Sequence, residues 1–284
     1  MTILPIKRLV YEISSNRSLP LHDKLPTVTF RGAFGYSLFQ ILSRDFTIPS
    51  MQKKAEVYQN LFYPEGIDNN SMNKNPGRPF VLRGDYTRLD RKSFIMEMML
   101  FGRCIDAEIL LDTVINNMCE MGVGNQNMRC RCVKLYSEIL ELAKPVLDNG
   151  NVCVNMQTPT RIKSNKVYLT DSLPFYNLIA RLQARIKDLV STYTSNEPPE
   201  CDFELLELAK KIVSIPAGLE YFRTKRTSSR TDMDCNLSGL TGSMHYSGNL
   251  KPFEEILSYL PWVHIGSSTA FGCGWCTIKY STSY

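Results

Sequence analysis

The chain has 284 residues, of which 43% are hydrophobic and 21% are charged. This length and apolar content suffice for the packed core of one large domain or two small ones, and they exclude global disorder. The 33 basic and 28 acidic residues leave a net charge of +5, which permits a nucleic-acid partner without requiring one.

The start of the chain lacks the pattern of a secretion signal. Lys7, Arg8 and Glu12 interrupt the apolar residues of MTILPIKRLVYEI, so no apolar core of a signal peptide forms. No stretch approaches the roughly 18 consecutive apolar residues of a membrane span. Nine cysteines without a secretion signal indicate reduced thiols. We therefore expect a soluble, cytoplasmic protein with no membrane partner.

The first half of the chain alternates strand and helix patterns. The predicted strands lie at 6–13, 80–82 and 94–101, and the predicted helices at 29–44 and 107–119. The last segment, at 133–142, fits either a strand or a helix. The glycines of MGVGNQN close the second helix. A run rich in Asn, Gly and Pro at 66–79 indicates a loop.

The second half repeats this order. The predicted strands lie at 152–156, 167–169, 215–222, 239–246, 263–265 and 275–280, and the predicted helices at 173–193, 203–213 and 250–260. Two βαββαβ units of the ferredoxin-like type have this cadence. We therefore predict an α+β fold with two tandem ferredoxin-like (RRM-like) domains, at residues 1–150 and 151–284.

A glycine-rich segment near the carboxyl end, HIGSSTAFGCGWC, is the most specific local motif. Such a loop can bring backbone N–H groups close to a phosphate chain, although a tight turn without a ligand is the simpler alternative. No Lys-Ser/Thr pair of a Walker loop follows the last glycine, and no helix of a dinucleotide fingerprint clearly follows. The candidate RNA-contacting residues of this loop are Gly266, Ser267, Ser268, Thr269, Gly272 and Gly274.

A second motif, YFRTKRTSSRT, concentrates positive charge. Its four cations fall within eight residues that contain no acidic side chain, and they are Arg223, Lys225, Arg226 and Arg230. Alternation along a strand would place Arg223 and Lys225 on one face, which suits contacts to a nucleic-acid backbone. A solvated basic loop is the alternative.

The order of several short blocks along the chain resembles one protein family. The blocks are RGAFGYSLF, VYQNLF before PGRPFVLR, MLFGRC, MGVGNQN, TPTRIK, GLTGSMHYSG and HIGSSTAFGCG. Together they resemble the CRISPR-associated pre-crRNA-processing endoribonucleases of the RAMP superfamily (Cas-six type), over nearly the whole chain. The resemblance implies two tandem ferredoxin-like domains, a Gly-rich loop that contacts RNA, and metal-independent cleavage of CRISPR repeat RNA without a cofactor.

The reaction that the resemblance implies is attack of a ribose 2′-OH on the adjacent phosphate, which leaves a 2′,3′-cyclic phosphate and a 5′-OH. Histidine suits the proton transfers because its unperturbed pKa is about 6.5. The candidates are His22 and His245, assisted by Arg31 or Tyr36; the family often has a histidine in the helix that here contains Tyr36. An exposed loop histidine and a strand histidine without a catalytic role are the alternatives.

The expected partner is CRISPR repeat RNA or mature crRNA. We predict that Lys163 and Lys166 join the basic segment along the phosphates and that His264 orients the glycine loop or contacts RNA. The main alternative is a non-catalytic crRNA-binding RAMP subunit of an effector complex, and the chain is also compatible with a processing domain fused to or detached from an adaptation module. The sequence leaves a monomer and a homodimer open.

Two pairs of cysteines that are close in the sequence could each supply half of a zinc site. Cys130 and Cys132 are separated by one residue rather than by two to four, and Cys273 and Cys276 fall on a predicted strand, where they would point to opposite faces. We therefore predict no metal site and buried structural thiols.

Overall fold

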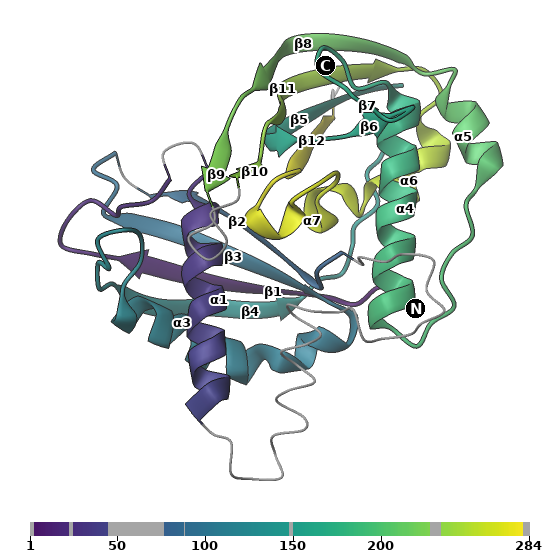
Figure 1. Ribbon diagram of the computed structural model, residues 1–284. Coiled ribbons are helices and arrows are strands. Elements are labelled where there is room, and N and C mark those ends of the chain that lie inside the picture. Colours follow the sequence, from purple (N-terminus) through teal and green to yellow (C-terminus); the bar gives the residue numbers. More distant parts are fainter. Residues whose placement is uncertain are drawn as a thin grey trace. The chain divides into compact units, whose positions relative to one another are not determined.

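The computed structural model describes residues 3–22, 25–44, 77–87, 89–147, 150–227 and 234–280. The chain divides into two compact units, the first formed by Met1–Leu140 with Asp188–Pro198 and the second by Glu141–Lys187 with Pro199–Tyr284. Each unit contains a four-stranded antiparallel sheet (Figure 1). The domain boundary at 150/151 stays a prediction; it lies at the first residue of the first strand of the second sheet.

The first unit has the chain order of a ferredoxin-like fold. Its elements are β1 (Ile6–Ser14), α1 (Thr27–Arg44), β2 (Phe80–Tyr86), β3 (Ser93–Phe101), α3 (Glu108–Met121) and β4 (Arg131–Ile139). The strands lie in the order β2-β3-β1-β4, and every neighbouring pair is antiparallel. The segment at 133–142 that fitted either period is therefore the edge strand β4.

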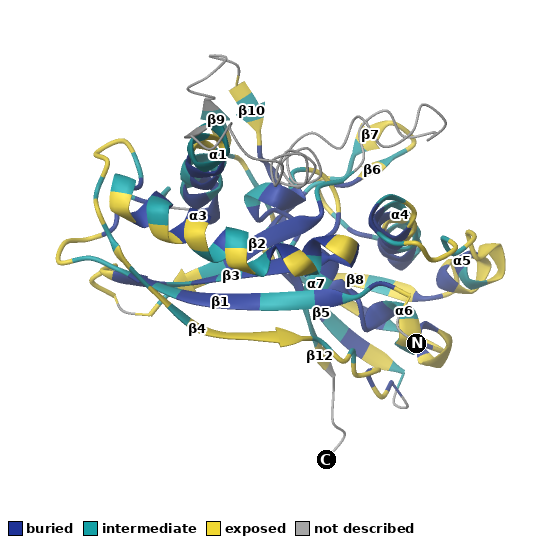
Figure 2. Cartoon of the chain, turned by 90° about the horizontal axis from the view of Figure 1, so that it is seen from below, coloured by how far each residue is buried: buried dark blue, intermediate teal, exposed yellow. Residues whose placement is uncertain are grey.

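The core of the first unit forms where α1 packs on the sheet. The ring of Phe30 lies 5.1 Å from that of Phe94, and the ring of Phe34 lies 5.7 Å from that of Phe80. A helical spacing of four residues puts Phe30 and Phe34 on one face of α1. Figure 2 shows the central strand β1 buried or half-buried along its length, whereas the edge strand β4 is largely exposed.

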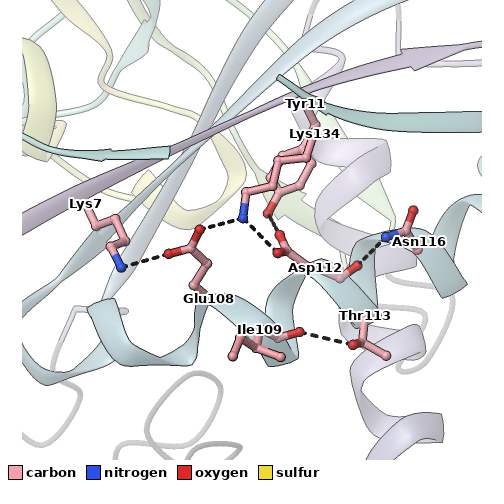
Figure 3. Close-up of polar contacts among 8 residues, drawn as sticks. All are labelled: Lys7, Tyr11, Glu108, Ile109, Asp112, Thr113, Asn116 and Lys134. Carbon is pink, nitrogen blue, oxygen red and sulfur yellow. Dashed lines mark hydrogen bonds and ion pairs between the residues drawn. The ribbon is translucent and has the colours of Figure 1, made fainter. Parts of the chain in front are cut away.

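A charged network fastens α3 to the sheet (Figure 3). The Glu108 carboxylate accepts hydrogen bonds from Lys7 on β1 at 2.8 Å and from Lys134 on β4 at 2.5 Å. Lys134 also donates to Asp112 at 2.7 Å, and Tyr11 donates to the same carboxylate at 2.6 Å. The hydrogen bonds from Lys134 and Lys7 lower the pKa of Glu108 to about 2. These contacts link the helix to two neighbouring strands at once.

Helix α4 (Phe175–Tyr193) begins in the second unit and ends in the first, to which Asp188–Pro198 belongs. Tyr193 is fully buried, and its hydroxyl donates to the Gly77 carbonyl at 2.8 Å. Gly102 has a φ of +58°, and a Cβ there would lie 2.1 Å from the Tyr193 carbonyl oxygen. A segment from beyond residue 187 thus completes the packing of the first unit.

The second unit repeats the ferredoxin-like order, with two small hairpins added. Its elements are β5 (Asn151–Thr160), β6 (Lys163–Ser164), β7 (Val167–Tyr168), α4, α5 (Phe203–Ala209), β8 (Val213–Phe222), β9 (Lys225–Thr227), β10 (Asp234–Asn236), β11 (Gly239–Ser247), α6 (Glu254–Leu257), α7 (Leu260–Val263) and β12 (Cys276–Tyr280). The main sheet has the order β12-β5-β11-β8. The hairpins are β6–β7 and β9–β10.

The core of the second unit gathers around Phe175, at the start of α4. Its ring lies 4.9 Å from that of Tyr246 on β11 and 4.8 Å from that of Phe253. The Tyr246 hydroxyl is buried and donates to the Leu173 carbonyl at 2.8 Å, so the phenol enters the core without an unpaired polar group. In the described part of the chain, no helix combines the length and the apolarity needed to cross a membrane.

Two predictions of secondary structure near the carboxyl end are wrong. The predicted strand at 263–265 is instead the last residue of α7 followed by His264 and Ile265 in an irregular segment. Val263 and Ile265 are both fully buried, and a short buried apolar run has the same appearance in a strand and in other structures. The predicted helix at 250–260 consists of short helical pieces separated at Ser258 and Tyr259.

Candidate nucleic-acid interface

The glycine-rich loop lies between α7 and β12 and packs closely against the end of β5. Gly266 has a φ of +87°, and a Cβ there would lie 2.5 Å from the Arg161 carbonyl oxygen. Gly274 has a φ of +78°, and a Cβ there would lie 1.9 Å from the Ile265 carbonyl oxygen. Since L-residues rarely adopt this backbone region and no space remains, both positions require glycine.

Hydrogen bonds from the TPTR segment of β5 hold the loop in one conformation. The Thr158 hydroxyl donates to the Gly272 carbonyl at 2.7 Å and accepts from the Trp275 amide at 2.9 Å. The Gly274 amide donates to the Pro159 carbonyl at 3.0 Å, and the Ser267 amide donates to Arg161 at 3.1 Å. A loop with these contacts is preorganised, so it loses little conformational entropy when it binds a ligand.

His264 supports the loop from inside. Its side chain is fully buried, and its Nδ1 lies 3.1 Å from the Cys273 carbonyl oxygen. Of the two roles that the sequence left open, this position favours orientation of the loop over direct contact with RNA. The loop residues Thr269, Gly272 and Gly274 are also buried.

The part of the loop that reaches the surface is small. Gly266 and Ser267 are exposed and Ser268, with a φ of +62°, is half-buried. These three residues therefore form the solvent-facing side of the loop. The buried members of the motif shape the loop rather than line its surface.

An aromatic contact brings the basic segment to the glycine loop. The Arg226 guanidinium, on β9, lies 5.3 Å from the ring centre of the half-buried Phe271. Arg223 is exposed just before β9. Lys225 pairs with Asp234 across the β9–β10 hairpin at 2.7 Å, and this hydrogen bond raises the pKa of Lys225. Arg230 lies outside the described residues.

The β6–β7 hairpin adds a second group of cations beside the loop. The Arg161 guanidinium lies 3.9 Å from the ring centre of Tyr168 and donates to the Asn236 carbonyl at 3.1 Å, and the Lys163 ammonium lies 4.6 Å from the same ring. The turn of this hairpin consists of Asn165 and Lys166, which both have positive φ angles. Lys166 is therefore exposed at the tip of the hairpin. Cations held over an aromatic face are well ordered.

His22 is in the loop that leads into α1, in the first unit. Its Nδ1 accepts a hydrogen bond from the Leu25 amide at 3.2 Å, and its own amide donates to the Thr29 hydroxyl at 3.0 Å. An accepting Nδ1 means that the neutral ring carries its proton on Nε2. In this tautomer the ring can donate from Nε2 but cannot take a proton there.

The two assisting residues lie on different sides of α1. Arg31 is half-buried, and its guanidinium lies 5.5 Å from the ring centre of Phe80. Tyr36 is 56% exposed, and its hydroxyl accepts from Gln40 at 2.8 Å. Five residues of a helix correspond to a rotation of about 140°, so the two side chains do not point in the same direction.

His245 lies on β11, as the sequence predicted, with its side chain exposed. It is paired with Cys153 on β5, whereas the glycine loop is hydrogen-bonded to Thr158 and Pro159 of that strand. Cys153 and Thr158 are five positions apart, which corresponds to roughly 17 Å of extended strand. The structure therefore does not bring His245 to the glycine loop.

The cysteines of the CGWC segment are buried and lie in two different settings. The sequence prediction that both lie on a strand is wrong, because Cys273 is in the turn of the glycine loop and Cys276 begins β12. Burial raises the pKa of each thiol to about 12. The described residues contain no group of three or more His, Cys, Asp or Glu side chains arranged to hold a metal ion.

The structure adds three residues that the sequence did not single out. Arg161 and Tyr168 form the cation–aromatic pair beside the loop, and Phe271 receives Arg226. Arg161 falls within the TPTRIK block and Phe271 within the HIGSSTAFGCG block, so both blocks were usable signals. No local pattern marks Tyr168, because its contact with Arg161 depends on the register of a short hairpin.

Comparison with known families agrees with the fold in both halves of the chain. Residues 154–276 match the family described as the CRISPR-associated endoribonuclease Cas6, and residues 4–160 match a family described as an N-terminal domain. No curated protein sequence matches the chain.

Solved structures of Cas6 proteins share the architecture. Thermus thermophilus Cas6 is 15% identical with a TM-score of 0.59, and the match covers 97% of this chain and 99% of that one. A Cas6 product complex is 13% identical with the same score and coverage, and another Cas6 product complex is 13% identical with a TM-score of 0.53, covering 96% and 99%. The predicted tandem ferredoxin-like fold is thus confirmed.

Proposed function

We propose that this chain, whose residues 154–276 match the family described as the CRISPR-associated endoribonuclease Cas6, binds CRISPR repeat RNA and cleaves it through attack of a ribose 2′-OH, without a metal ion. One observation carries the RNA-binding part of the proposal. Arg226 stacks on Phe271 of the glycine loop. Arg161, which follows β5, accepts from the Ser267 amide of the same loop and lies over the ring of Tyr168 on β7. Two cationic segments thus converge on one preorganised turn.

The cations beside the loop would follow the phosphates of the RNA. Arg161, Lys163 and Arg226 are already ordered by aromatic rings, so binding costs little side-chain entropy. Arg223 and Lys166 are exposed and can extend the contact on either side. The exposed Gly266 and Ser267 let the backbone of the RNA approach closely.

Cleavage requires that the attacking 2′-oxygen lie in line with the leaving 5′-oxygen. One group must accept the proton of the 2′-OH and another must protonate the leaving oxygen, while cations offset charge on the phosphorane. We assign the donor role to His22 in its imidazolium form, which gives the Nε2 proton to the leaving 5′-oxygen and becomes the neutral ring, whose Nδ1 accepts from the Leu25 amide. Arg31 or Tyr36 would assist from α1. His245 is the weaker candidate because its strand position is remote from the glycine loop.

The test is incubation of the wild-type protein with its repeat RNA in EDTA. We expect a product that ends in a 2′,3′-cyclic phosphate, and no product from RNA with a 2′-deoxy nucleotide at the cleaved position. His22→Ala should reduce the single-turnover rate by about 10²–10⁴-fold, whereas His245→Ala should retain it. Equal rates for wild type and His22→Ala would reject the histidine assignment.

The same assay separates an enzyme from a binding subunit. A non-catalytic crRNA-binding subunit of an effector complex would retard the RNA in a native gel and leave it uncut in a denaturing gel. Cleavage that stops in EDTA and returns with Mg²⁺ would reject the metal-independent mechanism. A cytoplasmic location, association with effector subunits and the choice between monomer and homodimer remain parts of this proposal.

A further inference from the structure

A pocket of about 320 Å³ opens at one end of the first unit's sheet, between the loop that follows β1 and the turn that joins α3 to β4. Its volume is at the lower end of the range typical of ligand sites. The residues that line it are Ser15, Asn16, Arg17, Gln126, Met128 and Arg129.

The two walls of the pocket are fixed in backbone conformation. The Ser15 amide donates to Lys92 at 2.9 Å, and the Met128 amide closes the opposite turn by donating to Val123 at 3.0 Å. Gly124 has a φ of +70°, and a Cβ there would lie 2.6 Å from the Pro20 carbonyl oxygen. The glycines of the MGVGNQN block thus let this turn sit directly against the β1 loop.

The chemistry of the lining suits an anion. No carboxylate lines the pocket, and its polar groups are two guanidinium groups, two amides and a hydroxyl. Arg17 and Arg129 are exposed, and among the described residues no acidic side chain pairs with either. Arg131 follows on β4, opposite Ser14 at the end of β1. A planar guanidinium fork matches the oxygens of a phosphate.

Building on the RNA-binding function proposed above, we propose that this pocket holds a phosphodiester of the bound RNA and so provides an anchor on the first unit. Arg17 and Arg129 contact the phosphate oxygens. The Gln126 amide is placed to donate to the phosphate or to an adjacent 2′-OH, whereas the Ser15 hydroxyl donates to the Met128 sulfur at 3.2 Å and ties the two walls together. Because the pocket reads backbone rather than bases, it adds affinity and fixes the path of the RNA without selecting sequence.

The test is the salt dependence of RNA binding by the Arg17→Gln/Arg129→Gln protein. The probe is repeat RNA made uncleavable by a 2′-deoxy nucleotide at the cleaved position. Its binding is measured by fluorescence anisotropy between about 0.05 M and about 0.5 M salt. Each phosphate contact to a single strand contributes about 0.7 to the slope of log K against log[salt]. Because the pocket holds one phosphodiester, we expect the slope to fall by about 0.7 and the affinity at about 0.1 M salt to fall about 5-fold.

The control is Lys187→Gln/Lys251→Gln, which removes two exposed positive charges from other parts of the chain. It should retain the wild-type slope. Circular dichroism spectra of both variants should match that of the wild type, which checks that both variants are folded. If wild type cleaves repeat RNA but the arginine variant keeps its slope, the pocket proposal is overturned and the proposed function stands. If wild type neither binds nor cleaves the RNA, the proposed function itself fails.

A free anion is the competing occupant. Inorganic phosphate at millimolar concentration, at constant ionic strength, is the probe for it. A rise in the melting temperature of wild type that is absent from the arginine variant, together with equal RNA affinities, would identify a site for small anions and overturn the RNA assignment. A loss of RNA affinity in the Arg17→Gln/Arg129→Gln protein that is absent from the control variant supports the RNA assignment.

Discussion

Glu108 provides a quantitative test of how α3 is held on the first sheet. Glu108→Gln keeps the shape of the side chain and removes the charge that accepts from Lys7 and Lys134. Lys134 keeps its bond to Asp112 at 2.7 Å, whereas Lys7 loses this ion pair. The variant therefore weakens the network of Figure 3 without dismantling it.

The magnitude follows from the pKa of Glu108, which the two lysines lower from 4.5 to about 2. For a fully buried group this shift would correspond to about 3.4 kcal/mol of stability. The carboxylate is 20% exposed and its partners are 17% and 30% exposed, so solvent screening reduces the expected loss to about 1–1.5 kcal/mol at pH 7. Because the folded-state pKa is depressed, this stabilisation is present above pH 4.5 and is lost as the pH falls towards 2.

The assay is urea unfolding of wild type and variant at about pH 7 and about pH 3. By linkage, less than half of the difference should remain at about pH 3. Glu207→Gln is the control, because its exposed ion pair with Lys210 should contribute little. A deficit in Glu108→Gln that is the same at both pH values would refute the electrostatic explanation and indicate a loss of packing instead.

Three further substitutions test the glycine-loop surface. Gly274→Ala should lower the free energy of unfolding in urea by about 2–4 kcal/mol, because the new Cβ causes backbone strain and a backbone clash. Gly218→Ala is the control: its Cβ would have no atom within 4 Å, so it should lower the free energy of unfolding by only about 1–2 kcal/mol. Equal losses in the two variants would contradict the clash at Gly274. Thr158→Val should destabilise the protein by about 1–3 kcal/mol, because it leaves the Gly272 carbonyl and the Trp275 amide without their hydrogen bonds to the Thr158 hydroxyl. An unchanged midpoint of urea unfolding would show that these two hydrogen bonds do not stabilise the loop. Tyr168→Leu should weaken repeat-RNA binding about 2–5-fold by freeing its cations, and unchanged affinity in a filter-binding assay would remove the pair from the interface.

Local patterns predicted most of the fold. The strand at Ile6 and the helix around Phe34 were found because alternation and helical spacing are written into neighbouring residues. The segment from Val133 stayed ambiguous because the largely exposed edge strand β4 contains no regular alternation between apolar and polar residues. The prediction of a strand at residues 263–265 was wrong because the apolar side chains at its two ends reflect burial and not strand structure.

The candidate site was predicted in pieces. Composition identified the glycine loop and the basic segment separately, but the contact between Arg226 and Phe271 depends on how β9 folds back towards the loop. The stacking of Arg161 on Tyr168 likewise depends on the register of a short hairpin. Contacts between residues that are distant in sequence leave no periodic signal, so one sequence cannot specify them.

The participation of Asp188–Pro198 in the first unit has a consequence for synthesis of the chain. An amino-terminal fragment that ends at residue 150 lacks Tyr193, and with it the packing on Gly102 and the hydrogen bond to Gly77. The ribosome therefore releases the last part of the first unit only after β5 and most of α4 have emerged. Since domains generally fold as units in order of synthesis, the two units of this chain are expected to mature together rather than one after the other.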